Sequence, residues 1–170
     1  LRRGPSVSHR PRAGGLTQPA VAWRLARKPW ADLSGEGARL AGGRWNSPGK
    51  PVAYLSEDAA LPVLEVLVHL DLSPELLPDD YVLMRVDLTY LESADPARWR
   101  EDGPANLVDE SDSKRFGDQW FEEARTPILR VPSVIVAESF DLVLNARHPL
   151  AANIPDPTSR PFAFDTRLFG

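Results

Sequence analysis

The sequence predicts a single domain of the α+β class, and three observations lead to that prediction. A chain of 170 residues fits one domain, and a domain of this size buries roughly 70% of its unfolded surface in one core. Runs with the pattern of strands outnumber those with the pattern of helices, and the two do not alternate as a doubly wound sheet requires. Seventeen prolines are scattered along the chain, which favours many short strands joined by irregular loops.

In the first half of the chain, residues 20–26 have the aromatic and aliphatic composition of a strand. A glycine-rich loop is expected at residues 35–46, followed by a short strand at residues 51–56. Residues 61–70 (LPVLEVLVHL) are apolar enough for a mostly buried helix. Its Pro62 is expected in the first turn, because a proline in the interior would break the helix.

In the second half, residues 81–88 alternate polar and apolar side chains, as a half-buried strand does. The polar residues 91–113 contain prolines and several acids and are expected to form a long surface connection. After them we expect a helix with aromatic residues at helical spacing, two β-rich runs and a final strand that closes the sheet, at residues 113–124, 128–137, 140–145 and 162–169.

The composition is that of an ordinary soluble globular protein, with 42% hydrophobic and 26% charged residues. No apolar run approaches the ~20 residues of a membrane helix, so no membrane partner is expected. Cysteine is absent, which excludes disulfides and thiolate chemistry and fits a reducing compartment, so we expect a cytoplasmic protein. The net charge of −4 (20 basic minus 24 acidic) gives no global attraction to nucleic acid, and no direct nucleic-acid partner is expected.

The N-terminal residues differ from the rest in charge. Residues 1–15 hold four arginines and no acid, and they lack the apolar core of a signal peptide. We expect residues 1–17 to be a disordered or vector-derived leader and residues 18–170 to be the folded domain, with a basic interaction arm as the alternative for the leader. The only methionine is Met84, so Leu1 is expected to follow processing or trimming.

Several familiar motifs are approached but not matched. A dinucleotide fingerprint would need a third glycine where Leu40 stands, and a P-loop would need its first glycine where Arg44 stands. The three histidines, at 9, 69 and 148, have no second ligand at a metal-site spacing, so no metal is expected. No GxSxG motif supports a serine hydrolase.

Two charged residues stand inside apolar elements. Glu65 lies on or beside the apolar face of the expected helix, where an unpaired carboxylate is costly, so it needs a partner or a function. A pair with His69, four residues on, is the structural alternative to a catalytic carboxylate. Arg24 poses the same problem in a strand, and either a salt bridge or the bidentate binding of an anion would answer it.

The glycine-rich loop offers further candidates. Arg39 and Arg44 lie among glycines, where the backbone can approach an anion closely, and a solvated loop is the alternative. Tyr54 could stack on an aromatic ring or belong to the strand core. Ser133 is the weakest candidate. Together these residues suggest phosphate-binding arginines, a platform for a ring and a carboxylate that could stabilise a cationic sugar transition state.

An ordered set of motifs resembles the RES-domain family over residues 18–150. The motifs, in chain order, are Trp23-Arg24-Leu25, Gly42-Gly43-Arg44-Trp45-Asn46, Gly49, Ala53-Tyr54-Leu55-Ser56, Leu64-Glu65-Val66-Leu67-Val68-His69, Val131-Pro132-Ser133 and Asn145-x-x-His148-Pro149. The resemblance implies the toxin of a bacterial type II toxin-antitoxin system, with an Xre-like antitoxin as partner. It also implies an ADP-ribosyltransferase-like fold with a split β-sheet core, and NAD⁺ as substrate without a metal.

The resemblance further implies roles for individual residues. Arg24 and Arg44 would hold the pyrophosphate or the adjacent ribose, and Tyr54 would stack on nicotinamide. Glu65 would bond the nicotinamide ribose and stabilise its oxocarbenium character, while Ser133 would support Glu65 or the carboxamide. The substrate site would also include Arg39, Trp45 and Asn46, and the arginine of the family's name stays open among Arg24, Arg39 and Arg44.

Three functions remain open on the sequence. The first is transfer of ADP-ribose from NAD⁺ to a protein, phosphoribosyl pyrophosphate synthetase being one type of target in the family. The second is an NAD⁺ glycohydrolase or phosphorylase that depletes cellular NAD⁺, since loop surfaces and water exclusion choose the acceptor. The third is a non-catalytic module that binds a nucleotide or the antitoxin through its arginine loop.

Overall fold

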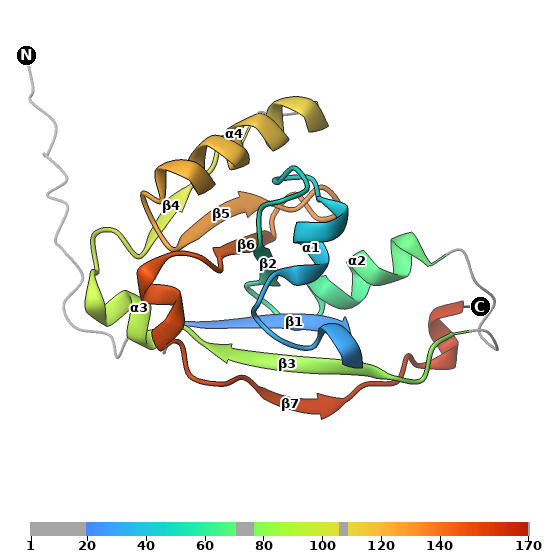
Figure 1. The fold of residues 1–170 in the computed structure, drawn as a ribbon. Helices are drawn as coiled ribbons and strands as arrows, with labels where there is room; N and C mark the ends of the chain where they lie inside the picture. The colour runs from blue at the N-terminus through green and yellow to red at the C-terminus, as the bar shows by residue number, and fades with distance from the viewer. Residues whose placement is uncertain (1–19, 71–76, 106–108, 170) are drawn as a thin grey trace, which may run out of the picture.

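The computed structural model describes residues 20–70, 77–105 and 109–169. These residues form one α+β domain around a seven-stranded mixed sheet (Figure 1), which confirms the predicted class. The strands are β1 Val21–Arg27, β2 Val52–Ser56, β3 Tyr81–Asp87, β4 Arg100–Asp102, β5 Ile128–Pro132, β6 Phe140–Asn145 and β7 Thr158–Pro161. The prediction for residues 1–17 falls outside the described residues.

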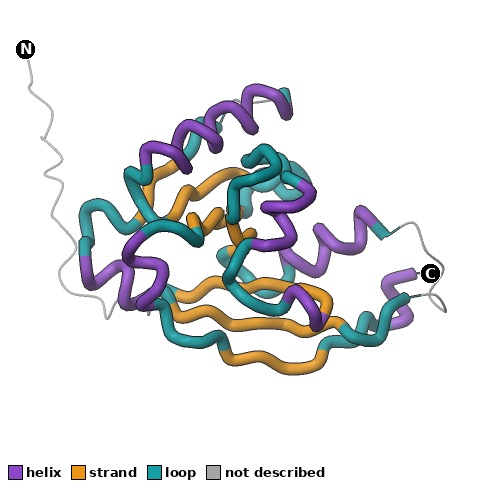
Figure 2. The backbone as a smooth tube through the Cα atoms, in the orientation of Figure 1, coloured by secondary structure: helices purple, strands orange, loops and turns teal. Residues whose placement is uncertain are grey.

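The strands lie in the order β4-β5-β6-β2-β1-β3-β7, and every neighbouring pair is antiparallel except β4 and β5. The helices are α1 Glu36–Ala41, α2 Leu61–His69, α3 Thr89–Ala94 and α4 Glu110–Glu123, with short 3-10 helices η1 Lys28–Trp30, η3 Pro149–Asn153 and η4 Thr166–Phe169. Figure 2 shows most helices above the strands and at their two sides, while β7 forms the lower edge of the molecule. No helix in the described ranges is long and apolar enough to cross a membrane.

The sheet is split between β1 and β2. These strands share a single register pair, Trp23 with Ser56, whereas β1 pairs with β3 at seven positions and β2 with β6 at five. Figure 1 shows the two groups, with β1, β3 and β7 below β2 and β4, β5 and β6 above it. Beside the opening, α1 and α2 both contact β2.

Successive side chains of β2 point to opposite faces of the sheet, and both faces pack against other residues. Ala53 and Leu55 belong to a buried cluster with Leu142 and Leu144, while Val52 and Tyr54 face the cluster under α4. The alternation therefore sends Val52, Tyr54 and Ser56 to the same side of the sheet, where the cavity described below lies.

Three expected elements differ in the structure. The glycine-rich loop contains the helix α1, which starts after Gly35 at a positive φ of 70° and carries an ion pair between Glu36 and Arg39 three residues apart. The expected surface connection contains α3 and β4. The strand β5 ends at Pro132, because proline has no N–H to continue the ladder.

Two further predictions were wrong. The last strand is β7, Thr158–Pro161, and not residues 162–169, whose aromatic side chains pack edge to face on the end of β3, with the rings of Phe164 and Tyr81 centred 5.2 Å apart. The helix α2 begins at Leu61 with Pro62 in its first turn, as predicted, but it is not mostly buried. Its Leu64 is 39% and its Val68 64% exposed, because only one side of the helix packs on the sheet.

Candidate active site

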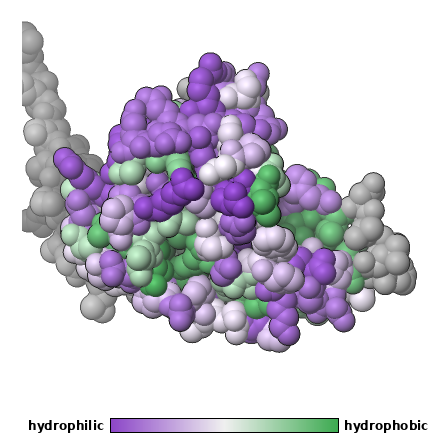
Figure 3. All heavy atoms as spheres, viewed as in Figure 1, coloured by the Kyte–Doolittle hydropathy of each residue, from purple (hydrophilic) through white to green (hydrophobic). Residues whose placement is uncertain are grey.

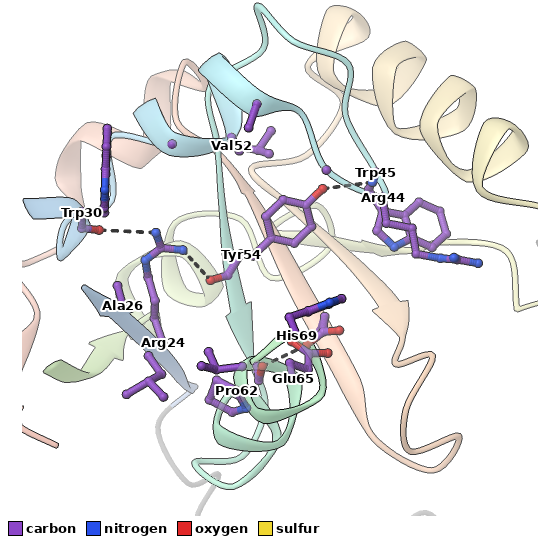
Figure 4. A pocket seen from close by; sticks show the side chains of 18 of the residues that line it. Arg24, Ala26, Trp30, Arg44, Trp45, Val52, Tyr54, Pro62, Glu65 and His69 are labelled. Atoms are coloured by element: carbon purple, nitrogen blue, oxygen red, sulfur yellow. Dashed lines mark hydrogen bonds between the residues drawn. The ribbon is translucent and has the colours of Figure 1, made fainter. Parts of the chain in front are cut away.

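A cavity of about 890 Å³ opens where the sheet splits, between β1 and β2 and beside α1 and α2. Figure 4 shows the side chains that line it. Five of the residues predicted from the sequence line it. They are Arg24 on β1, Tyr54 on β2, Glu65 on α2, and Arg44 and Trp45 in the turn between α1 and β2. Elements far apart in the sequence therefore meet at one site.

The guanidinium of Arg24 bridges the split in the sheet. Its Nη1 donates a hydrogen bond to the backbone O of Tyr54 at 3.0 Å, and its Nη2 donates to the backbone O of Trp30 at 3.4 Å (Figure 4). Its Nε is buried and, within the described residues, has no hydrogen-bond partner. Burial lowers the pKa of Arg24 from its ordinary value, and Asp32 opposes that shift. The group still carries its charge at neutral pH, since arginine is effectively always protonated in proteins.

A network of hydrogen bonds fixes the ring of Tyr54. Its hydroxyl accepts from the backbone N of Trp45 at 2.9 Å and donates to Oδ1 of Asn46 at 2.8 Å. The amide of Asn46 donates in turn to the backbone O of Ala38, Ser47 and Lys50. Because both capacities of the hydroxyl are used by protein, the ring is the part of Tyr54 that is left for a ligand.

The turn that carries Arg44 and Trp45 is attached to α4. Its backbone bridges Gly43 and Asn46, and Ser47 donates to both oxygens of Asp118, from N at 2.8 Å and from Oγ at 2.5 Å. Helix α4 begins at the N-cap Asp109, which accepts from the backbone N of Ser111. Trp45 is only 4% exposed and packs in the cluster under this helix.

Glu65 projects from α2 into the cavity. The Oγ of Ser133 donates to Oε1 of Glu65 at 3.4 Å, and the same Oγ accepts from the backbone N of Ile135 and Val136. Ser133 thereby ties the helix to the turn after β5. Within the described residues Glu65 forms no ion pair with His69, although both side chains line the cavity.

A second carboxyl group, that of Asp141 on β6, lies next to Glu65. Ser56, its register partner on β2, donates from Oγ to Oδ1 of Asp141 at 2.9 Å. Burial is the main cause that raises the pKa of Asp141 to about 8, and the charge of Glu65 and a hydrogen bond with it add to the shift. At neutral pH Asp141 is therefore mostly an uncharged acid.

Charged side chains lie around the cavity, with apolar side chains between them. Arg24 lies at one side of Tyr54 and Arg44 at the other, and Glu65 on α2 lies below Tyr54 in the view of Figure 4. Figure 3 shows hydrophobic side chains at the surface beside α1 and α2, and others at the lower left of the same face. Such an arrangement suits an elongated ligand with an anionic part, an aromatic part and a part that becomes positively charged.

Two predicted substrate-binding residues do not line the cavity. Arg39 points from α1 to Glu36, with two contacts of 2.6 Å between the guanidinium and the carboxylate. Asn46 is fully buried and serves the network around Tyr54. The structure thus brings together Arg24, Arg44, Trp45, Tyr54 and Glu65 around the cavity. Ser133 is not part of the lining but donates a hydrogen bond to Glu65.

The sequence reasoning missed Asp141, its partner Ser56 and Trp30. Asp141 carries the same signal that identified Arg24, since it is a charged residue in the otherwise apolar run Phe140–Asn145. Its proximity to Glu65 could not be read from the sequence, because it depends on the register between β2 and β6. In the described ranges no group of three or more His, Asp or Glu side chains is placed to hold a metal ion.

Comparison with known proteins connects this geometry with a family. Residues 21–165 match the family described as the RES domain. A protein of Sphingobium sp. (strain YBL2) named Prs ADP-ribosylating toxin is 37% identical over 157 residues, which cover 86% of this chain and 94% of the relative. A Pseudomonas putida protein named Toxin Res is 31% identical over 149 residues, which cover 88% of this chain and 99% of the relative.

The fold has a counterpart among solved structures. A chain in the crystal structure of the M. tuberculosis MbcT-MbcA toxin-antitoxin complex superimposes with a TM-score of 0.65 over 89% of this chain and 87% of that chain. The sequences are 22% identical, so this likeness shows a shared fold.

Proposed function

The chain belongs to the RES-domain family of toxins, and we propose that it cleaves the bond between nicotinamide and ribose in NAD⁺ and transfers ADP-ribose to a protein. One observation carries the proposal: Arg24, Tyr54 and Glu65, which come from three different elements, line a single cavity. The volume of about 890 Å³ lies in the range of ~300–1,000 Å³ typical of ligand sites.

Different sides of the cavity suit different parts of the dinucleotide. The arginines supply cationic donors for the pyrophosphate. The fixed ring of Tyr54 offers a flat face for nicotinamide. Trp45 would help to shape the same pocket. We leave Arg39 and Asn46 out of direct contact with the ligand, since neither lines the cavity.

Glu65 would carry the chemistry. As the glycosidic bond breaks, its electron pair moves to the ring nitrogen, and nicotinamide leaves as a neutral molecule while positive charge develops on the ribose. A carboxylate held beside that charge lowers the barrier, as in glycosidases. The acceptor nucleophile then forms the new bond to the ribose carbon and loses its proton. Ser133 would keep Glu65 in place through its hydrogen bond.

The acceptor and the partner rest on the relatives. The Sphingobium protein is named a Prs ADP-ribosylating toxin, which supports a protein acceptor, and we propose phosphoribosyl pyrophosphate synthetase as a candidate. The structural neighbour comes from a toxin-antitoxin complex, which supports an antitoxin partner, for which we propose an Xre-like protein.

Incubation of the purified protein with NAD⁺ and phosphoribosyl pyrophosphate synthetase tests the acceptor. We expect mass spectrometry to find ADP-ribose on the synthetase, in amounts equal to the nicotinamide released. Nicotinamide release without any modified protein would overturn the transfer and leave hydrolysis, or phosphorolysis if the release requires phosphate. Lack of release, together with NAD⁺ binding, would leave a non-catalytic module.

A further inference from the structure

We propose that Asp141 is a positioning residue for Glu65: its carboxyl group, held by Ser56, donates a hydrogen bond to the Glu65 carboxylate and keeps that carboxylate oriented. The inference rests on the proposed function, because it assigns a role toward the carboxylate that would stabilise the ribosyl cation.

The backbone fixes where Asp141 lies. It stands on β6 at the same face as Val143, opposite Ser56 of β2, and it lines the cavity together with Ser56 and Glu65. The hydroxyl of Ser56 donates to Oδ1 of Asp141 at 2.9 Å. One side of the carboxyl group is therefore held by the sheet, and Glu65 from α2 is hydrogen-bonded to it.

Two carboxyl groups can share a hydrogen bond only when one of them carries a proton. The groups around Asp141 favour the proton there, since Glu65 on α2 and Asp58 before α2 are both acids and Ser56 on β2 is neutral. Burial acts in the same direction. The cationic side chain of Arg24 and the imidazole of His69 also line the cavity, but burial and Glu65 are the largest causes of the raised pKa of Asp141.

This arrangement gives Glu65 two donors from two different parts of the fold. Ser133, after β5, donates to Oε1 at 3.4 Å, and Asp141 donates from β6. Two donors on different elements fix the orientation of the carboxylate. If Asp141 lost its proton, repulsion between two carboxylates would replace the hydrogen bond and move Glu65 from its place.

Substitutions of Asp141 separate this role from others. Asp141→Asn keeps an oxygen for Ser56 and an N–H donor for Glu65, so we expect kcat at pH 7 within about threefold of the wild type. Asp141→Ala removes the donor, and we expect kcat to fall on the order of tenfold with little change in KM, as for the loss of one hydrogen bond to a charged group. Equal and severe loss in both variants would overturn the proposal, because it would show that the ionised carboxylate of Asp141 is required.

The pH profile supplies a readout that a purely structural role would not move. We expect kcat of the wild type to decline as Asp141 ionises, with a midpoint near pH 8, and the decline to be absent in Asp141→Asn. An identical alkaline decline in both proteins would contradict the inference.

Carboxyl titration by NMR, with ¹³C-labelled aspartate, tests the inference without activity. We expect one aspartate resonance to titrate near pH 8, to vanish in Asp141→Asn and to move to lower pH in Glu65→Gln, where the neighbouring charge is gone. If no aspartate titrates above pH 6, the inference fails. A wild type that titrates in this way but never cleaves NAD⁺ would instead contradict the proposed function alone.

Discussion

The hydroxyl of Tyr54 holds the ring in place and is not itself available to a ligand. It accepts a hydrogen bond from the backbone N–H of Trp45 and donates one to the side-chain oxygen of Asn46, and both of these residues are buried. We predict that Tyr54→Phe lowers the free energy of unfolding by about 1–3 kcal/mol, because both groups lose their partner. The variant should still cleave NAD⁺ below its melting temperature, since the ring remains.

Denaturant unfolding and NAD⁺ cleavage of Tyr54→Phe and Tyr54→Ala check this prediction. The alanine variant loses the ring and should lose binding as well as stability. If folded Tyr54→Phe does not cleave NAD⁺, the hydroxyl itself takes part in the reaction.

Asp141 makes stability depend on pH in a defined direction. Its pKa is raised to about 8 in the folded protein, against about 3.9 in an unfolded chain. Between these two pH values the folded state therefore binds more protons than the unfolded state. The stabilisation of the fold by protonated Asp141 is complete below about pH 4 and is lost as the pH rises toward and through 8.

Melting temperatures from pH 5 to pH 9 test this dependence. Asp141→Asn should gain melting temperature relative to the wild type as the pH rises, because it has no proton to lose. A difference between the two proteins that stays constant with pH would contradict the raised pKa.

At the level of single residues, the sequence signal was a charge in an apolar element. That signal identified Arg24 in β1 and Glu65 in α2, and both line the cavity. It was equally present at Asp141, and a search of every strand for charged residues would have included it. The sequence alone could not show that Asn46 supports Tyr54, since the folded turn brings the two side chains together. Nor could it show that Ser133 contacts Glu65, which is distant in the chain.

Among the elements, α4 determines where the turn at residues 43–46 lies. A Cβ atom at Gly117 would stand 1.9 Å from the backbone O of Trp45, so the helix and the turn can approach closely only with glycine at this position. We predict that Gly117→Ala displaces the turn, lowers stability by several kcal/mol and weakens NAD⁺ binding, because Arg44 and Trp45 move.

Gly37→Ala in α1 is the matched control for stability. Its Cβ would meet only the ring of Trp30, at 3.8 Å, which is an ordinary contact, so a change within about 1 kcal/mol is expected, and alanine favours the helix. Thermal unfolding of both variants decides the matter. Similar stability in the two would show that α4 can shift to accept a side chain at Gly117.

Elements with a clear local pattern were predicted well. The strands β1, β2, β3 and β6 and the helices α2 and α4 appear near their expected positions. The burial of α2 was not predictable, because its apolar sequence does not reveal that the sheet splits beside it and leaves Leu64 and Val68 exposed. The edge strand β4 is three residues long and pairs in parallel with β5, a non-local contact that no local pattern indicates.

For the molecule as a whole, the split in the sheet is what makes a site. Arg24 takes the place of backbone hydrogen bonds where β1 and β2 separate, since its guanidinium donates to carbonyls of Tyr54 and Trp30. We predict that Arg24→Lys costs about 1–2 kcal/mol of unfolding free energy, because one ammonium cannot reproduce the planar fork. The affinity for NAD⁺ should fall as well.

Arg27→Lys in the same strand is the comparison for stability. Arg27 pairs with Asp80 at the surface, where ion pairs contribute at most about 1 kcal/mol, so this variant should unfold almost as the wild type does. If Arg24→Lys were as mild as Arg27→Lys, the bridge across the split would not stabilise the fold.

The measurement closest to the central claim is the rate of nicotinamide release from NAD⁺ by the wild type and by Glu65→Gln, with Glu138→Gln as control. Glu138 is an exposed carboxylate outside the cavity, so its loss should leave the rate unchanged. We predict that Glu65→Gln keeps the melting temperature within a few degrees and loses on the order of 100-fold or more in rate. Release that persists at the wild-type rate in Glu65→Gln would contradict the account.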